Sequence, residues 1–330
     1  MWSKRRSSCD CSAGRSASDG ERTVTRYALR RLVGILPTLL AIVTAAFFLM
    51  RLAPGGPFDE EQAIPPEIEA NLQAAYGLDQ PVLVQYRNYL AGLLHGDLGP
   101  SFRMKDFSVV ELIARGLPVT LTIGSAALAL ALLLGVPLGL LAARRHNGWI
   151  DHAVMGIALA GIAVPNFVVA PVLALVFGVR LGWLPVAGWE PGSLRHVLLP
   201  AVTLALPFVA YIARLTRGSL LEVLQSPFIR TARAKGLSGG AILRRHALRP
   251  TLLPVVSFLG PATAALLTGS LVVEQVFGLP GIGRYFVQGA INRDYTLVMG
   301  MVVFYAVLIL LLNLAVDLLY GWLDPRIRHE

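Results

Sequence analysis

The stretch G-L-P-V-T-L-T-I-G-S-A-A-L-A-L-A-L-L-L-G-V-P-L-G-L-L-A-A, residues 116–143, runs without a single ionisable side chain. A helix rises 1.5 Å per residue, so about 20 apolar residues cross the ~30 Å hydrocarbon core of a bilayer. Backbone polar groups inside lipid must be satisfied within the segment itself, which favours a helix over an isolated strand. The stretch therefore predicts a membrane-spanning helix.

Windows of the same kind recur along the chain. Together with the first they cover residues 32–50, 116–143, 153–179, 197–213, 250–273 and 295–316. The composition agrees, since 55% of residues are hydrophobic, 15% are charged and the mean hydropathy is +0.62. Ordinary soluble domains carry about 25% charged residues. The sequence predicts an all-α polytopic membrane protein with six transmembrane helices.

The 29 Lys and Arg residues set the expected orientation. Twenty of them fall in segments 1–31, 144–152, 214–249 and 317–330, which lie on one side of a six-span topology, and nine fall on the other side. Basic residues concentrate in cytoplasmic loops, so both termini are expected in the cytoplasm. The net charge of +9 thus reflects topology and attraction to anionic membrane lipid, and predicts no nucleic-acid partner.

Four segments are expected from these windows. Residues 1–26 are polar and non-periodic, and predict a disordered cytoplasmic tail in which Cys9 and Cys11 form neither a metal site nor a disulfide. Residues 27–115 hold the first transmembrane helix and an external cap loop with helices expected after Pro65 and Pro81, acting as a gate or merely a lid. Residues 116–323 form the core of five transmembrane helices, and 324–330 a cytoplasmic C-terminal tail.

The cytoplasmic loop 214–249 is the first candidate for function. It carries eight Lys or Arg residues against one acid, Glu222. A helix of this composition buries no wide apolar face against its own bundle, so its surface is expected to be available to lipid headgroups or to a partner protein.

Enzyme chemistry finds little support. The three lysines follow Ser3, Met104 and Ala234, so no P-loop can be written, and the six histidines show no metal-ligand spacing. Residues 236–240, G-L-S-G-G, fit G-x-S-x-G and leave an intramembrane serine protease as one hypothesis. A rhomboid-like site needs its serine within the membrane and a histidine on a neighbouring span, and neither is expected here. We predict no catalytic residue and no metal site.

The predicted spans contain no charge in their interiors, whereas ion-coupled carriers place ionisable groups at mid-membrane. This argues against a self-energised carrier or channel, which remains the alternative. Gly135 and Gly139 form a small-residue pair that permits close helix contact. The uncharged polar candidates for lining a path, each of which could instead bond between helices, are Asn166, Thr203, Tyr211, Thr263, Thr268, Tyr305 and Asn313.

Three motifs carry a resemblance to a known family. They are F-I-R-T-A-R-A-K-G-L at 228–237, E-Q-V-F-G-L-P-G-I-G at 274–283 and D-P-R at 324–326. As a set they resemble the permease subunits of bacterial ABC peptide importers of the oligopeptide type. In that family the loop carries the E-A-A-x-x-x-G motif, and here only Ala232 and Gly236 match its conserved positions, with Arg230 in place of the glutamate.

The resemblance implies a type I ABC importer permease in the bacterial inner membrane, forming half of a path for peptides. It implies a second homologous permease subunit, two ATP-binding subunits that hold ATP and Mg, and an extracytoplasmic peptide-binding protein; this chain itself would bind no cofactor. The residues it assigns to ATPase coupling are Arg230, Thr231, Ala232, Arg233, Ala234, Lys235 and Gly236. Energy supplied from outside the chain would explain why its spans need no charge of their own.

Overall fold

The computed structural model describes residues 16–52, 73–74, 77–104 and 106–323, which are helical apart from short connections and one antiparallel bridge between Pro100 and Ser108. The helices are α1 (Ser16–Leu52), α3 (Val82–Leu94), α4 (Val109–Arg144), α5 (Trp149–Ala163), α6 (Asn166–Leu173), η1 (Ala174–Arg180), α7 (Leu194–Gln225), α8 (Pro227–Ala234), α9 (Gly239–Ile242), η2 (Leu243–Ala247), α10 (Leu248–Val276), α11 (Ile282–Ile291) and α12 (Tyr295–Leu323). The expected all-α class is confirmed.

Five stretches in the described ranges are long and apolar enough to cross a membrane, and a sixth results only if α5 and the α6–η1 segment count as one span. That pair bends by 101°, so the prediction of one continuous helix over 153–179 is wrong. Pro165 is the cause, because a residue before proline is driven out of the helical region. Val164 accordingly adopts φ −86° and ψ 119° and ends α5.

The beginning of the chain also differs from expectation. The polar residues up to 26 were predicted to be a disordered tail, yet α1 already begins at Ser16. Extending an existing helix costs far less than nucleating one, and the apolar part of α1 supplies the nucleus. Residues 1–15 and 324–330, with Cys9 and Cys11, lie outside the described part of the chain.

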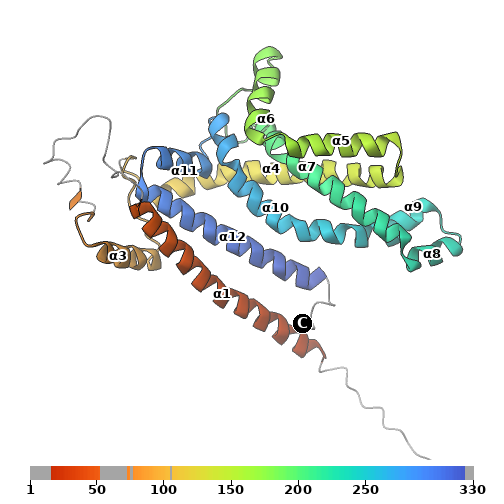
Figure 1. Cartoon of the computed structure of the whole chain (residues 1–330), viewed down its shortest axis with the longest axis horizontal. Coiled ribbons are helices and arrows are strands. Elements are labelled where there is room, and N and C mark those ends of the chain that lie inside the picture. The colour runs from red at the N-terminus through yellow and green to blue at the C-terminus, as the bar shows by residue number, and fades with distance from the viewer. Residues whose placement is uncertain (1–15, 53–72, 75–76, 105, 324–330) are drawn as a thin grey trace, which may run out of the picture.

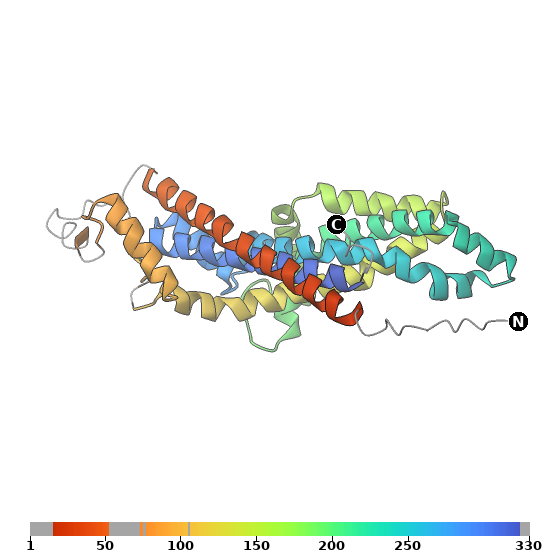
Figure 2. The same ribbon diagram turned by 90° about the horizontal axis from the view of Figure 1, so that it is seen from below.

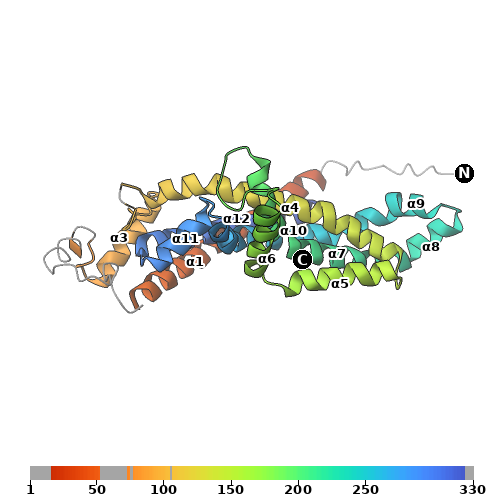
Figure 3. The same cartoon turned by 90° about the horizontal axis from the view of Figure 1, so that it is seen from above.

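The long helices run roughly along one common direction (Figure 1). The turn between α4 and α5 lies at the same end of the bundle as α8 and α9, whereas α3 and α11 lie at the opposite end. The first residues of α1 and the last of α12 both point toward the α8–α9 end. In Figure 2, α1 crosses the bundle diagonally beside α12, and in Figure 3, α6 stands across the direction of α5 and α7. This arrangement fits an even number of crossings.

The most extensive helix contact joins α4 and α7. Gly135 lies against Ile212 of α7, and Gly139 lies against the backbone of Ala213 and the side chain of Thr216. A Cβ atom built on Gly135 would be 2.9 Å from the Ile212 Cβ, closer than real Cβ contacts allow. The two glycines therefore let the helix backbones approach, as the small-residue pair predicted.

The helix expected after Pro81 is present as α3, and the one expected after Pro65 lies outside the described residues. α3 packs on α1 through Tyr86, whose ring centroid is 5.2 Å from that of Phe47 and whose hydroxyl is 2.6 Å from Thr44 Oγ1. One turn further on, burial raises the pKa of Tyr89 to about 12. An aromatic contact and a hydroxyl contact therefore join α3 to α1.

Candidate functional site

The predicted coupling loop forms the short helix α8. Pro227 occupies its first turn, where the missing N–H costs nothing and the fixed φ suits a helix. At the other end Gly236 adopts φ +79°. The Gly236 N–H donates to the Arg233 carbonyl (2.9 Å) and the Leu237 N–H donates to the Ala232 carbonyl (3.3 Å). This is a Schellman motif, and it explains why a glycine ends the helix.

One side of α8 is fixed to the chain's own core. Ile229 is fully buried and Ala232 is 7% exposed, and both belong to an apolar cluster with Ala143 of α4, Leu220 of α7 and Ile242 of α9. Ala232, which the resemblance assigns to coupling, therefore anchors the helix rather than facing a partner. Only these two residues of α8 are buried, yet loop 214–249 as a whole contributes to an apolar cluster, which the sequence did not predict.

The other side of α8 is basic and exposed. Of the remaining residues assigned to coupling, Arg230, Thr231, Arg233, Ala234, Lys235 and Gly236 all lie at the surface. No acidic residue occurs between positions 226 and 249, and the cations of α8 form no ion pair within the described ranges. The outcome is a rigid helix that presents uncompensated positive charge at one end of the bundle, a surface suited to an acidic groove on another protein.

Ser238, the serine of the G-x-S-x-G pattern, has a local structural role. It is the N-cap residue of α9, and its Oγ accepts a hydrogen bond from the Ala241 N–H at 3.4 Å. Helix N-termini favour serine for this bond. The serine thus lies at the exposed α8–α9 end of the bundle, far from the setting that an intramembrane nucleophile requires.

The structure separates the seven candidates for lining a path. Tyr211 alone lines the cavity that opens between α7 and α10. Thr203 is fully buried and donates to the Leu199 carbonyl of its own helix (2.8 Å), and Tyr305 is 8% exposed against the ring of Phe286. Thr203 and Tyr305 are therefore buried within this chain, the first bonded to its own helix and the second packed against an aromatic ring.

The remaining candidates are partly or fully exposed. Thr263 donates to Leu259 O (2.6 Å) and Thr268 to Ala264 O (2.9 Å), so each hydroxyl is satisfied by its own helix. Asn166 opens α6 directly after the Pro165 break, and Asn313 lies on the surface of α12.

One charged group outside the uncharged windows has a well-defined partner. Asp151, at the start of α5, is 2% exposed and forms a two-pronged ion pair with Arg217 of α7, at 2.5 Å and 2.7 Å. His146 lies 3.4 Å from the same carboxylate. A bidentate guanidinium–carboxylate pair fixes both distance and angle, so it ties the α4–α5 turn to α7 close to α8. The sequence feature that could have indicated this ion pair is Asp151 itself, a single acid directly before a long apolar stretch.

A second buried acid holds the opposite end of the bundle. Glu274 of α10 is fully buried, accepts the Thr120 hydroxyl at 2.7 Å and accepts the Arg284 N–H at 3.3 Å. Thr120 in turn accepts the Ile282 N–H at 3.0 Å. The carboxylate thereby fastens the connection between α10 and α11 onto α4. The quoted E-Q-V-F-G-L-P-G-I-G motif contains this acid and the backbone it binds.

These features define a class of protein: a helical membrane bundle with an exposed basic helix at one end. Residues 135–329 match the family described as the inner membrane component of binding-protein-dependent transport systems, and residues 24–124 match the N-terminal region of such components. The matches together cover most of the chain. This chain belongs to that family, and it is a transport component rather than an enzyme.

Curated relatives narrow the family further. The chain is 51% identical to the oligopeptide transport system permease protein OppB of Escherichia coli strain K12, over 92% of this chain and 99% of the relative. It is 44% identical to the dipeptide transport system permease protein DppB of Bacillus subtilis, over 92% and 98%. These relatives support the importer permease and not the alternative hypotheses of a self-energised carrier or a protease.

A solved structure shares the fold. The inward-facing MetNI methionine ABC transporter, in its native CY5 crystal form, aligns with a TM-score of 0.54 at 21% identity, over 65% of this chain and 97% of that chain. The expectation of an ABC importer permease fold is thereby confirmed.

Proposed function

We propose that this chain is one of two permease subunits in an ATP-driven importer of peptides, with oligopeptides favoured over dipeptides. The higher identity to the oligopeptide permease than to the dipeptide permease supports this preference. A second homologous permease subunit completes the translocation path, and an extracytoplasmic binding protein delivers the peptide to the end that carries α3 and α11. The protein resides in the bacterial inner membrane, with the α8–α9 end and both termini in the cytoplasm.

The observation that carries the proposal is α8 itself. Ile229 and Ala232 lock the helix to α4, α7 and α9, so a force applied to its exposed surface is transmitted to the bundle. Arg230, Arg233 and Lys235 supply the charge for docking into an acidic groove on one ATP-binding subunit. ATP and Mg are held by those two subunits, since the sequence contains no P-loop.

The test is uptake of a labelled oligopeptide into proteoliposomes that contain the purified importer. We expect uptake to need the ATP-binding subunits and ATP, and to survive collapse of the ion gradients. Uptake by this chain alone, driven by an ion gradient, would refute the proposal.

A charge-reversal pair tests the docking surface separately. Arg233→Glu should weaken association with the ATP-binding subunits and lower ATP-driven uptake, because a positive contact becomes a negative one. Arg144→Glu is the matched control, since Arg144 is also an exposed arginine at this end of the bundle, at the end of α4. Equal effects of the two substitutions on association would show that α8 is not the docking element.

A further inference from the structure

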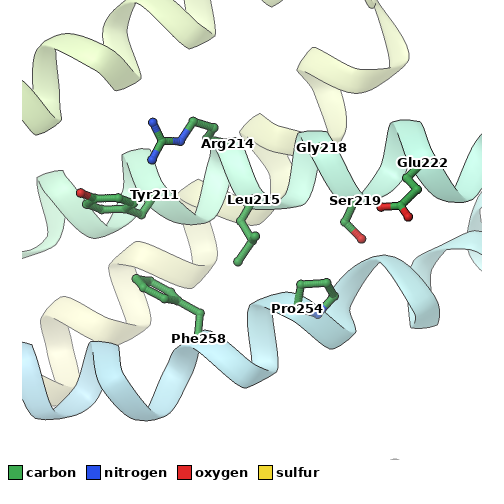
Figure 4. A pocket seen from close by; sticks show the side chains of 8 residues that line it. All are labelled: Tyr211, Arg214, Leu215, Gly218, Ser219, Glu222, Pro254 and Phe258. Atoms are coloured by element: carbon green, nitrogen blue, oxygen red, sulfur yellow. The ribbon is translucent and has the colours of Figure 1, made fainter.

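A cavity of about 420 Å³ opens between the C-terminal half of α7 and the N-terminal half of α10. Figure 4 shows Leu215 of α7 directed toward α10, and Pro254 and Phe258 directed back toward α7. The lining residues are Tyr211, Arg214, Leu215, Gly218, Ser219, Glu222, Pro254 and Phe258. The cavity thus combines an apolar floor with a polar edge.

The polar edge follows one stripe of α7. Tyr211, Arg214, Gly218 and Glu222 recur at helical spacing, and all four are exposed. Arg214 and Glu222 follow the apolar window 197–213, so these charges lie at the end of α7 that we place on the cytoplasmic side. Within the described part of the chain neither Arg214 nor Glu222 forms an ion pair. The lining of the cavity therefore includes one unpaired cation and one unpaired anion. The Arg214 guanidinium lies 5.2 Å from the centroid of the Tyr211 ring, which holds it in place.

The spacing of the two charges suits a short peptide. Eight residues separate Arg214 from Glu222, which corresponds to about 12 Å along the helix axis. An extended peptide spans about 3.3–3.6 Å per residue, so a chain of three or four residues reaches from one charge to the other. A peptide carries a carboxylate and an ammonium at its ends whatever its sequence. Leu215, Pro254 and Phe258 offer apolar contact without selecting a particular side chain.

We infer that this cavity is a peptide-binding subsite, in which Arg214 binds the C-terminal carboxylate and Glu222 binds the N-terminal ammonium. The inference rests on the proposed function and names where the cargo is held within this chain. Charge complementarity favours the peptide as occupant over the second permease subunit, because a free zwitterion supplies both opposite charges at the required separation.

A cysteine at position 218 reports on the occupant directly. A Cβ atom built on Gly218 meets no atom within 4 Å, so Gly218→Cys fits without distortion. The substitution is made in the full importer with Cys9 and Cys11 changed to serine, and the thiol is labelled with a small maleimide in detergent without nucleotide. We expect labelling to be slowed several-fold by millimolar trialanine. Alanine, and trialanine that is acetylated and amidated, should have no effect.

Two results would overturn the inference. The thiol could label slowly in the importer without peptide but rapidly in the isolated chain, which would assign the cavity to the second permease subunit. Alternatively the thiol could label rapidly whether or not trialanine is present, which would leave the cavity without a peptide.

Substitutions of the charged residues test their separate roles. Arg214→Gln should abolish protection by trialanine, because losing a charged hydrogen bond weakens binding about tenfold or more. Glu222→Gln should do the same, and Arg144→Gln should leave protection intact. Protection that persists in Arg214→Gln would overturn the assignment.

Failure of the peptide subsite can be distinguished from failure of the proposed import function. If the wild-type importer takes up peptide with ATP but trialanine does not protect position 218, only the subsite fails. If the wild-type importer takes up no peptide, the proposed function fails whatever the labelling shows.

Discussion

Gly139→Ala tests the contact that joins α4 to α7. A Cβ atom at this position would lie 2.7 Å from the Thr216 Cβ, whereas ordinary contact begins near 3.4 Å, so the helices must separate by at least about 0.7 Å. The Ala213 carbonyl, which is backbone and cannot rotate away, lies closer still. Overpacking of this kind costs about 1–3 kcal/mol.

Gly156→Ala is the matched control, because Gly156 is also inside an apolar helix and its added Cβ would meet no atom within 4 Å. Any intrinsic gain from replacing a helical glycine is shared by both variants and cancels in the comparison. A difference of about 1–3 kcal/mol corresponds to about 1.5–4 °C for a chain of 330 residues. The difference in melting temperature is measured by heating each variant in detergent and monitoring the remaining folded protein by size-exclusion chromatography. Melting temperatures for the two variants that agree within 1 °C would refute the packing argument.

Three further substitutions address the coupling end and the opposite end. Gly236→Ala should destabilise the chain by about 1–2 kcal/mol, because residue 236 has a left-handed backbone, and should weaken association with the ATP-binding subunits. Gly239→Ala is the control and should have neither effect, because Gly239 has no positive φ. Equal binding affinities of the two variants would contradict the Schellman motif as the reason for Gly236. Asp151→Asn should destabilise the chain by about 3–5 kcal/mol, and adding Arg217→Gln should recover part of that loss; additive losses in thermal unfolding would show that the pair is not coupled. Glu274→Gln should cost about 1–3 kcal/mol, because an amide cannot accept every bond that the carboxylate accepts; an unchanged melting temperature would show that the buried acid is dispensable.

The uncharged windows predicted most of the fold because membrane crossing depends on length and hydrophobicity, which the sequence states directly. Hydrophobicity carries no information about direction, however. The window 153–179 is apolar throughout, yet its helix turns by 101° at Pro165. A proline can either kink a helix or break it, and the packing of α6 across the bundle decides between the two.

Some features of the candidate site could likewise be predicted from the sequence, and others could not. The end of helix α8 could be predicted from the sequence, because a glycine after R-T-A-R-A-K is typical of a helix C-terminus. Polar residues inside the windows were not, because a threonine can be buried, bonded to its own helix or open to a cavity without any change in the pattern around it. Charges at window edges were overlooked because windows were cut at the first charge, although α7 continues 12 residues past position 213.

The positions of these charges bear on how force reaches the path. α7 runs unbroken to Gln225 and only Ser226 separates it from α8, while the ion pair between Asp151 and Arg217 fastens α5 to the same segment. The apolar cluster under α8 also includes Ala247, which directly precedes α10. Both walls of the cavity between α7 and α10 therefore begin at one packed junction. A displacement of α8 by an ATP-binding subunit would pivot these walls about their shared base, so we expect the cavity to change width before any more distant part of the bundle responds.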